Sequence, residues 1–213
     1  MDEKSLQEEF AKRADNAEQL AEVAAGGTAL LPGVLRAVSS SEAAVRFKSI
    51  KVLKLVSETN PETLYPHFGF FAELLDGGNS ILRWNAIDIL ANLAAADGGN
   101  RFGSLFRKVY GLLDEGGLIT AAHIVDGSAR IVAARPGLEQ RVTKELLRVE
   151  EIALPTEECR NILRGKVVTA FGQYIGQSRH SGPMLSFAEG LLTCTRPATR
   201  KKAEEFLKRH RGR

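Results

Sequence analysis

Residues 63–94, TLYPHFGFFAELLDGGNSILRWNAIDILANLA, decide how this chain folds. Apolar residues recur at spacings of three and four on both sides of the DGGN segment at 76–79, which is the period of a helix with one buried face. Glycine and small polar residues of this kind end one helix and begin the next. The stretch therefore predicts a helical hairpin, with a first helix of about 12 residues and a second of about 15 to 18.

The same unit occurs elsewhere in the chain. Residues 29–56, ALLPGVLRAVSSSEAAVRFKSIKVLKLV, share an early proline, a leucine-rich end to the first helix, a small-residue turn, and an apolar residue followed by arginine. The two arginines, Arg46 and Arg83, are 37 positions apart, and Thr120 stands 37 positions further on. Looser copies cover 141–176 and 183–210. The strand pattern of alternating apolar and polar residues never persists, so the sequence predicts an all-α chain of repeated hairpins.

A period near 37 to 40 residues, built from two antiparallel helices, resembles HEAT repeats, with armadillo repeats as the near neighbour. The resemblance covers about residues 27–210. It rests on the prolines of the first helices, the turn aspartate and the apolar–arginine pairs: Pro32, Pro66, Asp76, Val45–Arg46 and Leu82–Arg83. Later copies depart from the pattern, since Thr120 replaces the arginine and a longer turn surrounds Pro155. The resemblance implies a short right-handed α-α superhelix, or solenoid, of about five HEAT-like hairpins.

The expected organisation is one repeat domain over residues 1–213. Capping helices are expected at 1–26, followed by repeat units at 27–59, 60–98, 99–135, 136–178 and 183–213. Terminal units need a polar outer face, so in the N-terminal cap Leu6, Phe10, Leu20 and Val23 are expected to face inward, with Ser5 and Glu8 as a capping box. Because both ends look polar, we expect a complete array.

Composition indicates a folded soluble protein, with 44% hydrophobic and 26% charged residues among 213. The two cysteines, Cys159 and Cys194, lie 35 residues apart without metal-ligand spacing, so we expect free thiols, no metal site and no cofactor. No stretch approaches the roughly 20 continuous apolar residues that a membrane span needs, and the N-terminus is too acidic for a signal peptide. We therefore expect a cytoplasmic protein with no membrane contact.

The HEAT resemblance implies that the second helices line a concave binding surface. On residues 82–94, Leu82, Ala86, Ile89, Leu90 and Leu93 form an apolar stripe, whereas Trp84, Asn85, Asp88 and Asn92 lie on another side. We predict a partner-binding surface made of these polar positions and of residues on the neighbouring second helices: Trp84, Asp88, Asn85, Asn92, Lys51, His123, Asp126 and Arg130. Two alternatives stay open: Trp84 packs between adjacent second helices, or the polar strip is an ordinary solvated face.

Signatures of catalysis are absent from the sequence. It contains no GxxxxGK[ST] loop, no GxSxG elbow and no HExxH motif, and His123 with Asp126 alone does not make a metal site. HEAT-like hydroxylases use His-Glu pairs, and the chain has no such dipeptide. The spacing of Trp84 and Asp88 resembles the aromatic residue and carboxylate of HEAT-like alkylpurine DNA glycosylases, which hold damaged DNA on a basic concave face. We predict no catalytic residues.

Charge is distributed unevenly. Residues 1–23 carry seven acids and three bases, whereas residues 196–213 carry eight Lys or Arg and two acids. The basic end could contact phosphates or another anion through Arg200, Lys201, Lys202, Lys208 and Arg209. It could equally be a solvated helix, or could meet the acidic N-terminus of another copy. The predicted function is a non-catalytic scaffold that binds a protein or peptide; the alternative is a nucleic-acid-binding protein, including a glycosylase-like enzyme.

Overall fold

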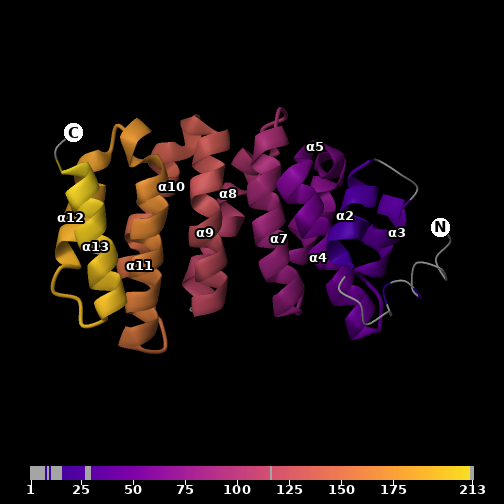
Figure 1. Ribbon diagram of the computed structural model, residues 1–213, viewed down its shortest axis with the longest axis horizontal. Helices are drawn as coiled ribbons and strands as arrows, with labels where there is room; N and C mark the ends of the chain where they lie inside the picture. The colour runs from indigo at the N-terminus through magenta and orange to yellow at the C-terminus, as the bar shows by residue number, and fades with distance from the viewer. Residues whose placement is uncertain (1–7, 9, 11–15, 27–29, 116, 212–213) are drawn as a thin grey trace. The chain divides into compact units, whose positions relative to one another are not determined.

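The computed structural model describes residues 8, 10, 16–26, 30–115 and 117–211 (Figure 1). Throughout these residues the regular structure is helical and no strand occurs. The contacts between residues divide the chain into two compact units, residues 1–101 and residues 102–213. We call them the N-terminal unit and the C-terminal unit and describe each by itself.

The N-terminal unit is built around α4 (Ala43–Thr59), which contacts α2, α3 and α7. Its described elements are, in chain order, α2 (Ala17–Ala25), α3 (Leu30–Ala37), α4, α5 (Pro61–Leu64), the 3-10 helix η1 (Tyr65–His67), α6 (Phe68–Leu74), α7 (Ser80–Leu93) and η2 (Ala94–Ala96). The segment expected to be one first helix is thus divided into α5, η1 and α6. Pro66 accounts for the interruption, because proline lacks the N–H that a continuous helix would use.

The turns before α4 and α7 are held by the arginines that the repeat pattern picked out. Arg83 donates from Nη2 to the carbonyl oxygen of Gly77 at 3.1 Å, and Arg46 donates from Nη1 to that of Ser40 at 2.7 Å. The side chain of Asn79 caps α7 by accepting hydrogen bonds from two backbone N–H groups in its first turn, at 3.1 and 3.2 Å. The arginine therefore has a structural role in joining first helix to second.

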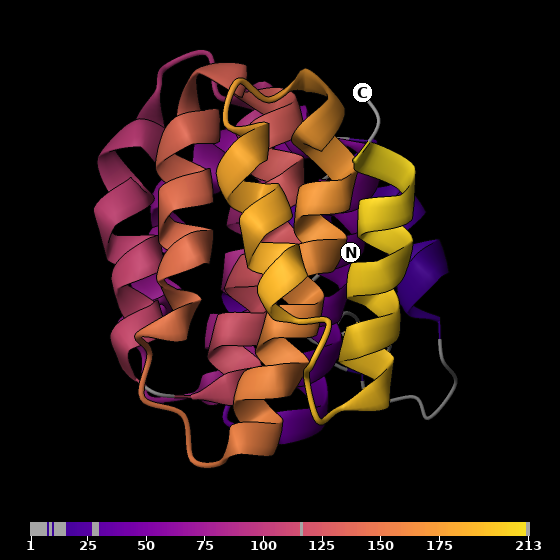
Figure 2. The ribbon, with the colours of Figure 1, turned by 90° about the vertical axis from the view of Figure 1, so that its left-hand side faces the viewer.

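The C-terminal unit is centred on α11 (Glu157–Tyr174), which contacts both α9 and α13. Its elements are α8 (Arg101–Gly111), which begins at the unit boundary, η3 (Leu112–Glu115), α9 (Leu118–Ala134), η4 (Pro136–Leu138), α10 (Glu139–Leu147), η5 (Arg148–Glu150), α11, η6 (Ile175–Gln177), α12 (Ser181–Gly190) and α13 (Pro197–His210). Figure 2 is turned so that α12 and α13, in yellow tones, face the viewer.

A glycine lets α11 and α13 approach closely. A Cβ atom on Gly165 would lie only 2.8 Å from Oγ1 of Thr199, which is nearer than real Cβ contacts come. The hydroxyl of Thr199 donates across the same contact to the carbonyl oxygen of Asn161 at 2.7 Å. The pair of helices is therefore joined by backbone approach as well as by apolar packing.

The helices can be sorted by the residue ranges expected for the repeat units, which remain a prediction. Residues 27–59 contain α3 and α4, 60–98 contain α5, α6 and α7, 99–135 contain α8 and α9, 136–178 contain α10 and α11, and the last range contains α13 with most of α12. In the expected cap, Phe10 and Leu20 are buried as predicted, whereas Val23 is 51% exposed and the inward position expected for it is wrong. Leu6 and Ser5 lie outside the described residues.

Candidate functional site

The predicted residues of α7 share one side of the helix, but they differ in exposure. Trp84 and Asn85 are half-buried, and Ile81, one turn earlier on the same side, is 40% exposed. Asn85 donates from Nδ2 to the carbonyl oxygen of Ile81 at 2.8 Å. We call Ile81, Trp84 and Asn85 the α7 patch. In the α7 patch, the large apolar side chains of Ile81 and Trp84 are both partly exposed to water.

Asp88 and Asn92 are not displayed beside Trp84, contrary to the sequence-based expectation. They are only 4% and 9% exposed, because this part of α7 packs against α4. Lys54 forms an ion pair with Asp88 at 2.6 Å between Nζ and Oδ2, and Asn92 donates from Nδ2 to the hydroxyl of Ser57 at 2.8 Å. Both polar side chains therefore link neighbouring second helices instead of facing a partner.

The other predicted partner-binding residues lie on two further helices, α4 and α9. Lys51 is exposed on α4, in the N-terminal unit. In the C-terminal unit, His123 is half-buried and Asp126 and Arg130 are exposed, at helical spacing along one side of α9. Asp126 accepts from Lys166 of α11, with 2.6 Å between Oδ2 and Nζ, so that its carboxylate also links two second helices. Because these α9 residues belong to the other unit, we treat them as a surface separate from the α7 patch.

The predicted basic residues lie on α13, and most are exposed. Arg200 is the exception, since it is half-buried and donates from Nη1 to the carbonyl oxygen of Cys194 at 3.2 Å. Lys201 lies 3.9 Å from Glu205, one turn along the helix. Lys202, Lys208 and Arg209 form no ion pair within the described part of the chain. We call these three residues the basic face of α13.

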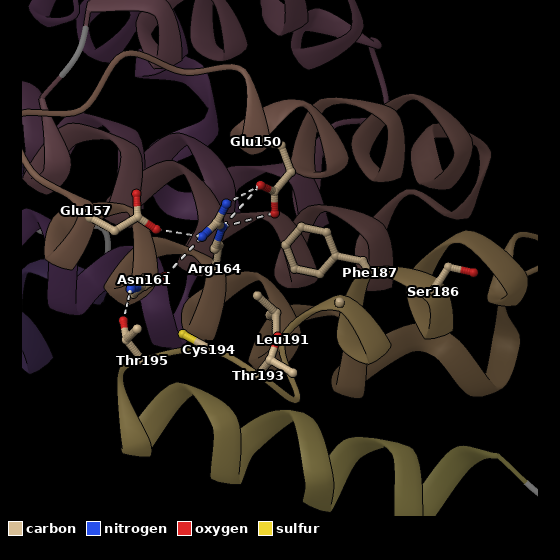
Figure 3. Close-up of a pocket in the computed structure, with 11 residues that line it drawn as sticks. Glu150, Glu157, Asn161, Arg164, Ser186, Phe187, Leu191, Thr193, Cys194 and Thr195 are labelled. Carbon is tan, nitrogen blue, oxygen red and sulfur yellow. Dashed lines mark hydrogen bonds and ion pairs between the residues drawn. The ribbon is translucent and has the colours of Figure 1, made fainter.

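A pocket that the sequence did not indicate lies in the C-terminal unit, between α11, α12 and the turns beside them (Figure 3). Its volume is about 490 Å³. Arg164 donates from Nε and Nη2 to the carboxylate of Glu150, and from Nη1 to Glu157 at 2.9 Å and to Asn161 at 3.0 Å. Phe187 and Leu191 provide apolar walls, as Figure 3 shows. The pocket thus combines an ion cluster with an apolar side.

The charge state of this pocket limits what it can bind. Burial lowers the pKa of Arg164, but hydrogen bonding to Glu150 and the nearby carboxylates outweigh burial and raise it. The guanidinium is therefore always charged, and its donors already face Glu150, Glu157 and Asn161. An anionic ligand would have to displace one of these acceptors. The remaining carboxylate lone pairs favour a cationic or donor group.

A polar cluster joins α10 to the segment before α12. Glu139 accepts from the hydroxyls of Ser178 at 2.8 Å and Thr143 at 2.9 Å, and its other oxygen lies 3.0 Å from Nδ1 of His180. Burial raises the pKa of the Glu139 carboxyl, but the hydrogen bonds, led by that of His180, hold the pKa below its ordinary value. Ser178 donates to the carboxylate and not to the imidazole. The arrangement thus lacks the serine–histidine contact that activates a nucleophile.

The described residues contain neither a cluster of metal ligands nor a membrane-spanning helix. Among them, no group of three His, Cys, Asp or Glu side chains is placed to hold a metal ion. Within the same residues, no helix combines the length and apolar character needed to cross a membrane. Cys159 is half-buried and Cys194 is buried, and neither forms a disulfide.

Comparison with solved structures shows which fold this is. The chain is similar to a designed armadillo repeat protein, "YIII(Dq)4CqI", at 15% identity and a TM-score of 0.60, over 96% of this chain and 98% of that one. An engineered protein from a structural genomics programme aligns at 15% identity and a TM-score of 0.45, over 98% of this chain and 96% of that one. No family model matches the sequence, and no curated protein matches it. The predicted all-α fold of the HEAT and armadillo type is confirmed.

Proposed function

We propose that this protein is a non-catalytic interaction module that binds a protein or peptide segment on the second-helix surface of its N-terminal unit. The α7 patch carries the proposal. Ile81 and Trp84 are partly exposed one turn apart on a helix whose other apolar residues are all buried. Exposed apolar side chains among polar ones are typical of contact surfaces, and tryptophan is prominent among residues that dominate binding.

The surroundings of Trp84 favour a protein partner over the glycosylase-like alternative. That alternative needs a carboxylate free to stabilise a cationic base, whereas the Asp88 carboxylate is buried and paired with Lys54. Asn85 and Lys51 supply a polar group and a positive charge at exposed or half-buried positions, which suits polar contacts at the rim of an interface.

The proposal is tested by affinity capture from lysate with three proteins in parallel: wild type, Trp84→Ala and Phe70→Ala. Phe70 is a matched control, since it is a half-buried aromatic residue of the same unit on a first helix, α6. We expect partners, identified by mass spectrometry, to be captured by wild type and Phe70→Ala and lost with Trp84→Ala. Equal capture by wild type and Trp84→Ala contradicts the proposal. Capture that disappears after nuclease treatment also contradicts it, because the bound partner would then depend on nucleic acid.

A second measurement places the partner on the patch directly. Trp84 is the only tryptophan in the chain, so its fluorescence reports on this surface alone. Titration with a purified, tryptophan-free fragment of the captured partner should shift the emission to shorter wavelength, because contact removes water from the indole. Binding that leaves the emission unchanged would mean that the partner docks elsewhere. Circular dichroism of each variant distinguishes loss of binding from loss of fold.

A further inference from the structure

A groove on the N-terminal unit, lined by none of the residues of the α7 patch, combines acidic and apolar side chains. It lies between α2 and α4 and has a volume of about 590 Å³. Ala21, Ala25 and Leu55 contribute its apolar surface. Glu18 and Glu22 stand beside it on α2, and Glu58 stands on α4. The groove therefore offers an apolar floor with carboxylates on both walls.

The three carboxylates have no cationic partner among the residues that the structure describes. Glu18, Glu22 and Glu58 are exposed, and none of their side chains forms an ion pair or hydrogen bond with another described residue. Glu18 and Glu22 are four residues apart on one helix, a spacing at which like charges repel each other. A cationic segment in the groove would relieve this repulsion, while the aliphatic stems of lysine and arginine cover the apolar floor.

The chain itself carries a surface of matching charge. The basic face of α13, Lys202, Lys208 and Arg209, is exposed and forms no ion pair within the described residues. We propose that the α2–α4 groove binds the basic face of α13 from a second copy of the chain, so that copies associate head to tail. The contact would be heterologous, since one copy contributes three carboxylates and the other contributes three cations, none of which forms an ion pair with a described residue of its own copy.

Charge reversal on each side tests the proposal by analytical ultracentrifugation. The groove variant is Glu18→Lys, Glu22→Lys and Glu58→Lys, and the α13 variant is Lys202→Glu, Lys208→Glu and Arg209→Glu. Wild type should self-associate as concentration rises, and should dissociate as salt is added. For each variant alone, the dissociation constant of self-association should rise by roughly tenfold or more, because three attractive pairs become repulsive.

The control variant changes net charge equally but outside the groove. It carries Glu42→Lys, Glu62→Lys and Glu73→Lys, three exposed positions in the same unit, and should associate like wild type. An equal mixture of the groove and α13 variants should recover association, since their reversed surfaces are complementary. A wild type that stays monomeric at low salt overturns the proposal, as does a folded pair of variants that fails to recover association when mixed.

Discussion

Replacing Asp88 tests whether this residue stabilises the protein or serves a partner. In Asp88→Ala the carboxylate that is paired with Lys54 at 2.6 Å disappears. A hydrogen bond to a charged group contributes about 1.5–3 kcal/mol. The Lys54 side chain is 32% exposed, so water replaces part of the lost interaction. We therefore expect the free energy of unfolding of the N-terminal unit to fall by about 1–2 kcal/mol.

The assay is urea unfolding followed by circular dichroism, for wild type, Asp88→Ala, Lys54→Met and the double variant. With a typical slope of about 2 kcal/mol per molar urea, the midpoint should fall by roughly 0.5–1 M in Asp88→Ala. The double variant should recover much of the loss, because neither member of the Lys54–Asp88 pair is left without the other. A change below about 0.5 kcal/mol in Asp88→Ala would place this residue with ordinary surface positions and refute the structural role.

Two further predictions concern the C-terminal unit. In the same urea assay, Gly165→Ala should lower the free energy of unfolding by about 1–3 kcal/mol, since the new methyl group would lie 2.8 Å from Oγ1 of Thr199. The control is Gly172→Ala on the same helix, which should be neutral or slightly stabilising because its Cβ would lie 3.7 Å from the nearest neighbouring atom. The pKa of the Glu139 carboxyl is held below its ordinary value in the folded state, so its stabilising effect is fully present above the pKa of the unfolded chain and is lost as the pH falls through the folded-state pKa. Glu139→Gln should therefore lower stability at pH 7 by about 1–2 kcal/mol and flatten its dependence on acid pH; an unchanged pH profile would mean that the bond to His180 contributes nothing.

Local signals in the sequence were sufficient to predict the fold. The DGGN turn, the prolines of the first helices, and Arg46 and Arg83 mark where helices end and begin, and each of these features acts over a few residues. The interruption at Pro66 was less visible, because a proline can also stand in the first turn of an unbroken helix.

The site could be predicted only in part, because exposure depends on neighbouring helices. On α7 alone, Asp88 and Asn92 fall on the same side as Trp84, which made all three look displayed. The α4 helix supplies Lys54 and Ser57 at distances that satisfy the two polar groups, so both can be buried. The pocket around Arg164 escaped prediction because Glu150, its main partner, comes from a turn 14 residues away whose course the sequence pattern does not specify.

The side-chain bonds between helices have a consequence for how the chain folds. Those described above join residues at most 41 positions apart, the longest being the contact of His180 with Glu139. Closing such short loops costs little chain entropy, and low contact order accompanies fast folding. Neighbouring helices can therefore find each other during synthesis, soon after the second of the two has been made, without waiting for a distant segment to arrive.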